Sequence, residues 1–200
     1  MFYKMEADRK YKDLWLNDRV GHFRSIICPK YPEHQRATRS ACNLSLELKS
    51  DKIGDFATTV YSDWLVSDKI ACALKESGLT GYELRLADIC NNSLGYSLWE
   101  LVVTGKGGEA HLDAGIVKIY QCDYCDHMQY HAFANGVGIV VDENNWDGSD
   151  FFTITAYPKY VLVTPKVKTI VEEGKWTGVC FVPSTELHRD ERLGNAVSPL

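Results

Sequence analysis

The chain has 200 residues, of which 45% are hydrophobic and 24% are charged, an ordinary composition for one globular domain. Its 22 basic and 27 acidic residues give a formal net charge of −5, which argues against a dedicated nucleic-acid-binding protein. No apolar run approaches the roughly 18 residues of a membrane span, and charges interrupt the N-terminal segment where a signal peptide would need an apolar core. We therefore expect a cytoplasmic protein that binds neither nucleic acid nor a membrane.

The first segment with chemical meaning is Cys28-Pro-Lys-Tyr31, which has the form of half a metal-binding knuckle. A complete knuckle brings two thiolates to one ion, but Tyr31 stands where the second thiol is expected. Cys28 is therefore a candidate ligand whose partners must come from other parts of the chain. Because the cytosol keeps thiols reduced, we expect no disulfide framework from the seven cysteines.

A strand, a short helix and a second strand are expected between residues 63 and 86. An apolar strand ends at Ser67, whose hydroxyl can cap a helix, and apolar residues then recur at helical spacing. Gly78 lies where helices commonly end in the left-handed conformation, and the second strand follows at 82–86. Cys72 lies in the apolar run of this helix, so we expect its side chain in the core.

The middle of the chain is rich in strand signals. Apolar and β-branched residues predict strands at 98–103, 116–120 and 137–141. The glycines of 105–108 favour a hairpin turn, because glycine readily adopts positive φ.

Cys122-Asp-Tyr-Cys125 is a complete CxxC motif, whose spacing lets both thiolates reach one ion from a tight turn. Structural zinc takes four ligands, so we expect one structural zinc ion held by Cys28, Cys122 and Cys125, with His34 as a candidate fourth ligand. Cys42, His127 and His131 are further candidates for that position. Two alternatives stay open: reduced cysteines without a metal, and a thioredoxin-like redox pair, which would open a helix after a strand.

An acidic segment follows, because no Lys or Arg occurs between Lys118 and Lys159. The polar loop 142–150 combines four acidic residues with a tryptophan, a pattern typical of an interface anchor in a charged surround. We expect partner-binding residues here, with an ordinary solvated loop as the alternative. The candidates are Asp142, Glu143, Trp146, Asp147 and Asp150.

The strand–helix–strand pattern returns near the C-terminus at an offset of 97 residues. Pro165 stands at the first helical position and Gly174 at the expected helix end. Cys180 lies in an apolar run, so we expect its side chain in the core. Asp55-Phe56 matches Asp150-Phe151 upstream. The matched pairs include Ser67 with Thr164, Thr80 with Thr177, and Gly81 with Gly178. So many coincident positions favour a duplicated unit over chance similarity.

We therefore expect an α+β fold, a mixed β-sheet with two short helices and possibly two similar strand–helix–strand halves. It forms a single domain over residues 1–188, with the internal echo between 55–86 and 150–182, and a polar tail at 189–200. If the two strands of a unit pair in parallel, their crossover should be right-handed.

The order of these motifs resembles the double-CXXCG family of bacterial paralogues over nearly the whole chain. The resemblance rests on Cys28-Pro29, Trp64–Lys69, Gly78–Gly81, Leu98–Val103, Cys122–Cys125, Ser149–Phe152, Val161–Val167 and Thr177–Phe181. This chain departs from the family pattern at both motifs. Tyr31 and Pro32 replace the second Cys and the Gly of the first, and Asp126 replaces the Gly of the second.

Some members of that family are regarded as immunity proteins, so the resemblance implies an antidote that binds a cognate bacterial toxin in the cytoplasm. The acidic segment predicts a basic surface on that partner. No nucleophile elbow or HExxH motif frames the histidines, so we expect no enzyme. The alternatives are a small zinc-dependent or thiol enzyme of the hydrolase kind, and a metal-free structural or assembly protein. Oligomeric state and toxin identity are left open.

Overall fold

The fold is taken from a computed structural model, which describes residues 1–11, 14–16, 23–39, 43–48, 52–90, 92, 95–131 and 137–187. Cys42 and the tail at 189–200 lie outside these residues. No helix among them has the length and apolar character needed to cross a membrane.

The described residues form two helices, two 3-10 turns and sixteen strands, which confirms the expected α+β class. The helices are α2 (Asp68–Glu76) and α3 (Pro165–Glu173). The strands are β1 (Tyr3–Ala7), β2 (Trp15–Leu16), β3 (Phe23–Ile27), β4 (Gln35–Arg39), β5 (Ser45–Glu47), β6 (Phe56–Thr58), β7 (Trp64–Ser67), β8 (Tyr82–Leu86), β9 (Asp88–Ile89), β10 (Leu98–Val103), β11 (Gly105–Lys106), β12 (Val117–Gln121), β13 (Met128–His131), β14 (Phe151–Ile154), β15 (Tyr157–Val163) and β16 (Val179–Pro183).

The two larger sheets have the same internal order. One runs β6-β7-β10-β8 and the other β11-β14-β15-β1-β16. The strands that flank each helix run parallel but do not pair, because an antiparallel strand lies between them. That strand is β10 in the first sheet and the N-terminal β1 in the second. The second sheet therefore pairs β1, from the start of the chain, with β15 and β16, from its last quarter.

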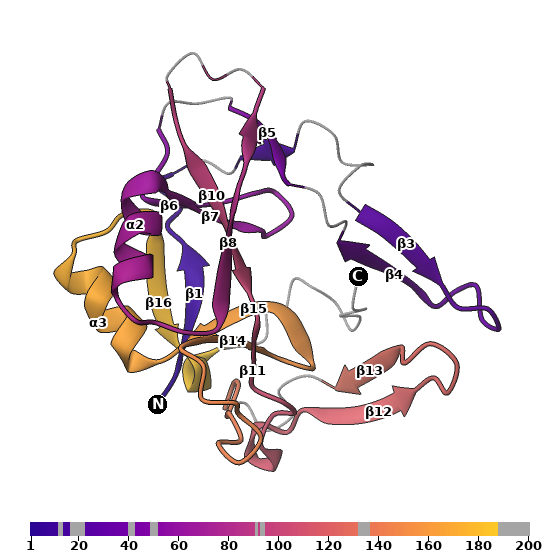
Figure 1. The fold of residues 1–200 in the computed structure, drawn as a ribbon. Helices are drawn as coiled ribbons and strands as arrows, with labels where there is room; N and C mark the ends of the chain where they lie inside the picture. Colours follow the sequence, from indigo (N-terminus) through magenta and orange to yellow (C-terminus); the bar gives the residue numbers. More distant parts are fainter. Residues whose placement is uncertain are drawn as a thin grey trace.

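The two helices lie side by side on one flank of the molecule (Figure 1). Their inward faces share one apolar cluster, which also takes in Phe56 and Phe151 at the starts of the two matching hairpins. Ile70 and Leu74 of α2 and Val167 of α3 are fully buried in it. Each helix therefore packs against its own sheet, and the two helices share one apolar cluster.

Residues of the repeat form matching hydrogen bonds between the two halves, each from a threonine of one half to an aspartate of the other. The backbone N–H and the hydroxyl of Thr177 each donate a 3.0 Å hydrogen bond to Asp55 Oδ2. The same groups of Thr80 donate to Asp150 Oδ2 at 3.0 and 3.2 Å. Thr164, the N-cap residue of α3, donates its hydroxyl to Asp150 Oδ1 at 2.8 Å and makes no capping bond. Each half is thus fastened to the other by an aspartate.

We expect Asp150→Ala to lower the free energy of unfolding by about 3 kcal/mol and Asp55→Ala by about 1 kcal/mol. The Asp150 side chain is the more buried of the two, and its loss leaves the donors of Thr80 and Thr164 without an acceptor. Urea denaturation of both variants measures the difference. An equal or smaller loss at Asp150 contradicts this order.

Several local expectations were wrong. Cys72 and Cys180 are exposed, because the buried face of α2 is Ile70, Ala71 and Leu74 and because Cys180 points outward from β16. At the end of α3, Lys175 and not Gly174 adopts the left-handed conformation.

Two expected elements of the central segment also differ from the structure. Residues 105–108 do not form a hairpin turn, because Gly105 and Lys106 pair in parallel with β14. Residues 137–141 form no strand, and only Val141 makes an isolated bridge, with Ala110.

Candidate metal centre

Two antiparallel hairpins, β3–β4 and β12–β13, extend from the side of the molecule opposite the helices, with their turns next to each other (Figure 1). The first turn carries Cys28 and His34, and the second carries Cys122 and Cys125. The hairpins therefore bring Cys28 close to Cys122, 94 residues further along the chain, and His34 close to Cys125, 91 residues further along.

The four side chains form one cluster in which all ligand atoms lie within 4.8 Å of one another, and this cluster could hold one metal ion. The Sγ atoms of Cys28 and Cys122 are 4.0 Å apart, and Cys125 Sγ lies 4.0 Å from His34 Nδ1. Around tetrahedral zinc, with Zn–S near 2.3 Å, two sulfurs lie about 3.8 Å apart. The observed spacings are close to that geometry, and the donor set fits the ion.

The first turn keeps the form of a knuckle although Tyr31 replaces the second thiol. The Tyr31 N–H donates to Cys28 Sγ at 3.3 Å, which folds the chain back over the thiol. The chain then turns back, because the His34 N–H donates to the Tyr31 carbonyl and the Cys28 N–H donates to the His34 carbonyl. This second turn carries the His34 imidazole to the cysteines of the other hairpin.

The second turn is closed by hydrogen bonds from Cys122 N–H to the His127 carbonyl, 2.8 Å, and from Asp126 N–H to the Cys122 carbonyl, 3.1 Å. Asp126 adopts φ 53°, the left-handed conformation that glycine adopts most easily. Aspartate tolerates that conformation better than most residues, so the turn closes without a glycine at this position.

The environment of Cys122 favours the thiolate. Burial raises the pKa of this thiol, but hydrogen bonds from the N–H groups of Tyr124 and Cys125 and from His34 outweigh burial and lower the pKa to about 6. A thiolate is the form that binds a metal. Burial raises the pKa of Cys125, and the neighbouring thiols Cys28 and Cys122 raise it further.

Lys30 joins the two turns beside the cluster. Its Nζ donates to the Tyr124 hydroxyl at 2.8 Å and lies 4.3 Å from the centre of that ring. The hydrogen bond to Tyr124 raises the pKa of Lys30, so the ammonium stays charged. Three thiolates and one divalent ion carry a net charge of −1, which a neighbouring ammonium offsets. No sequence pattern signals this pairing across 94 residues.

The geometry bears on the thioredoxin-like alternative for the CxxC motif and on the further ligand candidates His127 and His131. The motif lies between strands β12 and β13 and opens no helix, so it lacks the setting of a thioredoxin-like pair. His127 does not belong to the four-residue cluster, but its ring stacks on His34 with a centroid distance of 4.6 Å. His131 is also not in the cluster and ends β13.

The acidic loop 142–150 divides into surface and core. Asp150 is 9% exposed and both its oxygens are engaged, so it does not belong to an accessible partner surface. Trp146 is half-buried, packs edge-on against Phe2 at 5.0 Å and donates its indole N–H to the Ser149 carbonyl. Asp142, Glu143 and Asp147 remain at the surface.

Two of these surface acids keep their charge through local hydrogen bonds. The backbone N–H of Asn144 lowers the pKa of Asp142. Partial burial raises the pKa of Asp147, but hydrogen bonds from Ser149 and from the Lys106 N–H lower it further than burial raises it. The loop therefore presents negative charge throughout the physiological pH range.

No family model matches the chain, and no curated protein matches it significantly.

Proposed function

We propose that the protein is a binding protein of the immunity type, in which one structural zinc ion holds two hairpins together and the surface neutralises a cognate bacterial toxin. The observation that carries the zinc part of the proposal is the set of four candidate ligands, Cys28, His34, Cys122 and Cys125. The binding part is supported by the exposed apolar and acidic residues described below.

Three thiolates and one imidazole are a soft ligand set that suits zinc. A catalytic zinc keeps one position open for water or substrate, whereas structural zinc is bound by four protein ligands. Two of the thiols, Cys28 and Cys122, are at most 2% exposed, which leaves little room for a substrate. The ligand set thus favours a structural ion over the zinc-dependent hydrolase alternative.

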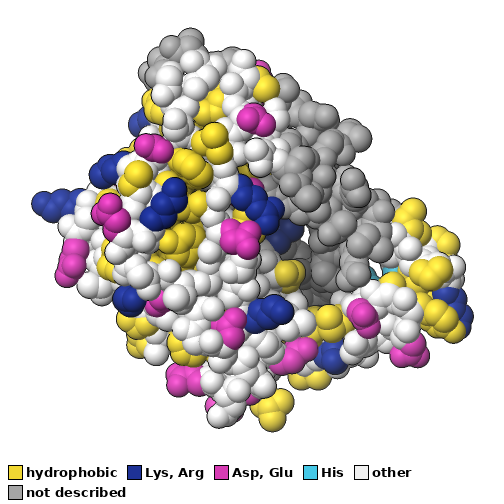
Figure 2. Space-filling view, in the orientation of Figure 1, with side chains coloured by type: hydrophobic (Ala, Val, Ile, Leu, Met, Phe, Trp, Pro, Cys, Tyr) yellow, Lys and Arg dark blue, Asp and Glu magenta, His cyan; other side chains and the backbone are white. Residues whose placement is uncertain are grey.

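The surface near the hairpins supports a binding role. Val117, Ile119 and Tyr124 are each more than half exposed, and hydrophobic side chains gather on the lobe at the right of Figure 2. Contiguous exposed apolar surface commonly marks protein contacts. The charged surface of loop 142–150 adds an electrostatic component that would attract a basic partner.

We expect Glu143→Lys to slow association with a basic toxin domain by about tenfold at low salt, because it reverses an exposed charge of the acidic loop. The matched control is Glu173→Lys, which makes the same charge change at an exposed residue of α3. Association rates by surface plasmon resonance at two salt concentrations measure the effect. Equal rates for both variants would remove the acidic loop from the interface.

The direct test is co-expression of this chain with the product of the adjacent reading frame. Rescue from toxicity together with co-purification supports the proposal. A toxic neighbour that is neither bound nor neutralised contradicts it. A separate activity assay tests the alternative: loss of a chemical activity in a folded Cys125→Ser variant would favour a thiol enzyme.

A further inference from the structure

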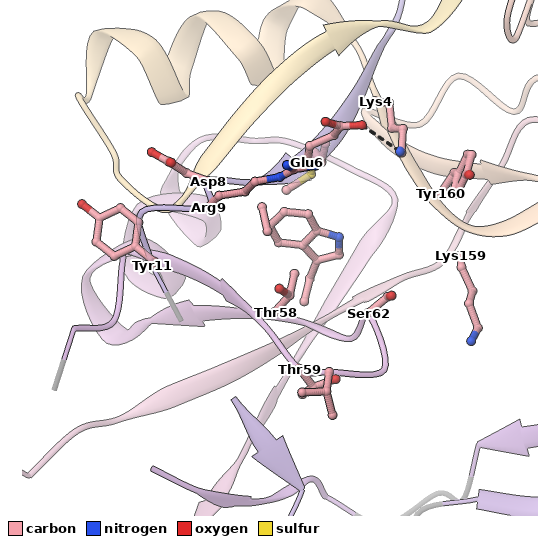
Figure 3. Close-up of a pocket in the computed structure, with 14 residues that line it drawn as sticks. Lys4, Glu6, Asp8, Arg9, Tyr11, Thr58, Thr59, Ser62, Lys159 and Tyr160 are labelled. Carbon is pink, nitrogen blue, oxygen red and sulfur yellow. Dashed lines mark hydrogen bonds and ion pairs between the residues drawn. The ribbon is translucent and has the colours of Figure 1, made fainter. Parts of the chain in front are cut away.

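A cavity of about 660 Å³ lies between the N-terminal strand β1 and the turn that joins β6 to β7 (Figure 3). Residues 4–9 and Tyr11 line one side, residues between 58 and 64 line another, and Lys159 and Tyr160 close one end. Small-molecule sites typically measure about 300–1,000 Å³. No residue of the metal cluster lines this cavity, and no sequence motif marks it.

The buried wall of the cavity contains a tryptophan whose polar group has no partner among the described residues. Trp64 is 6% exposed, and its indole N–H donates to no acceptor in the described part of the chain. Trp64 is one of the residues that line the cavity. Buried indole N–H groups usually find an acceptor, and here a ligand in the cavity could supply it.

The rim carries an excess of positive charge. Its two acids are engaged: Glu6 pairs with Lys4 at 2.9 Å, and Asp8 lies 3.9 Å from Lys10 and accepts the Lys10 N–H. Arg9 and Lys159 are exposed and form no ion pair with the described residues. Two cations of the rim are thus available to an anion.

A further donor comes from the β6–β7 turn. Ser62 adopts φ 70°, which is uncommon for a residue other than glycine, and its hydroxyl has no hydrogen-bond partner among the described residues. Figure 3 shows Arg9 on the upper side of the cavity, Ser62 on the lower side and Lys159 at one end. The residues that line the cavity thus include an indole, a hydroxyl, an ammonium and a guanidinium.

We propose that this cavity binds a small anion that carries a flat ring, the chemistry shared by mononucleotides and aromatic carboxylates. The ring would lie against the apolar surface of Trp64 and Met5, which are both buried. The anionic group accepts charge-assisted hydrogen bonds from Arg9, Lys159 and Ser62. This binding activity is separate from the proposed neutralisation of a toxin and does not depend on it.

The indole N–H resonance of Trp64 reports on the cavity directly. The chain has five tryptophans, so a ¹H–¹⁵N spectrum contains five indole signals, and Trp64→Phe identifies the relevant one. The probes are AMP and indole-3-acetate, with adenosine as the uncharged counterpart of AMP. We expect a saturable shift of the Trp64 signal with at least one of the charged probes, and at least tenfold weaker binding of adenosine than of AMP if AMP binds. The probe that binds tells which of the two sources is preferred.

The double variant Arg9→Gln/Lys159→Gln removes both available cations from exposed positions, so its fold should be preserved. We expect it to bind the active probe at least tenfold more weakly, whereas the control Lys175→Gln, which also loses an exposed lysine, binds it normally. The proposal is overturned if neither charged probe shifts the Trp64 signal at millimolar concentration. It is equally overturned if the double variant binds as tightly as the control.

Discussion

Chelation of the metal is expected to release the two hairpins while the two larger sheets stay folded. The four ligands come only from the turns of β3–β4 and β12–β13, whereas the helices and long strands are held by apolar clusters that contain none of them. Structural zinc contributes about 10–16 kcal/mol of apparent binding free energy at neutral pH, so its loss should dominate the local stability.

Hydrogen exchange measures this directly. After chelation, we expect the amides of β3, β4, β12 and β13 to exchange at least a hundredfold faster, while those of β1, β10 and β15 change little. Cys122→Ser should reproduce the effect, and Cys90→Ser, at an exposed cysteine outside the cluster, should not. If the amides of the hairpins exchange at an unchanged rate, the metal does not hold the hairpins together. If the whole protein unfolds, the effect of the metal is not confined to the hairpins.

The second large effect is expected from Gly178→Ala, which should lower the free energy of unfolding by about 3–5 kcal/mol. Gly178 has φ 88°, and a Cβ on it would lie 1.9 Å from the Phe56 carbonyl oxygen. The substitution therefore forces apart the contact between Thr177 and Asp55 that joins the halves. Gly81, its counterpart, faces the Phe151 carbonyl in the same way and should behave alike.

Gly78→Ala is the matched control for this prediction. Gly78 has φ 66°, but a Cβ there meets nothing within 4 Å, so only the backbone conformation is strained. We expect a loss of about 1 kcal/mol, measured by urea denaturation beside Gly178→Ala. Similar losses for both variants would show that close packing of the halves contributes little.

Much of the local structure could be predicted from sequence. The helices begin after Ser67 and Thr164 as expected, because hydrophobic periodicity and Pro165 mark them clearly, but neither hydroxyl makes the expected capping bond. The spacing of Cys122 and Cys125 and the incomplete motif at Cys28 indicated a shared site, and the structure places these residues with His34. These features depend on short-range patterns, which a sequence displays directly.

The features that could not be predicted from the sequence depend on contacts between distant segments. The strand between β15 and β16 is β1, from the other end of the chain, and no local pattern could indicate that. Asp150 looked like a surface acid among others, but its bonds to Thr80 and Thr164 bury it. Cys72 looked like a core residue because its run is apolar, yet it lies on the outer face of α2.

The central claim is that Cys28, His34, Cys122 and Cys125 bind one zinc ion. Zinc K-edge X-ray absorption of the purified protein tests it most directly, because it counts the sulfur and nitrogen ligands. We predict stoichiometric zinc with three sulfurs at about 2.3 Å and one nitrogen at about 2.0–2.1 Å. Protein isolated without zinc, or a first shell with fewer than three sulfurs, would contradict the claim.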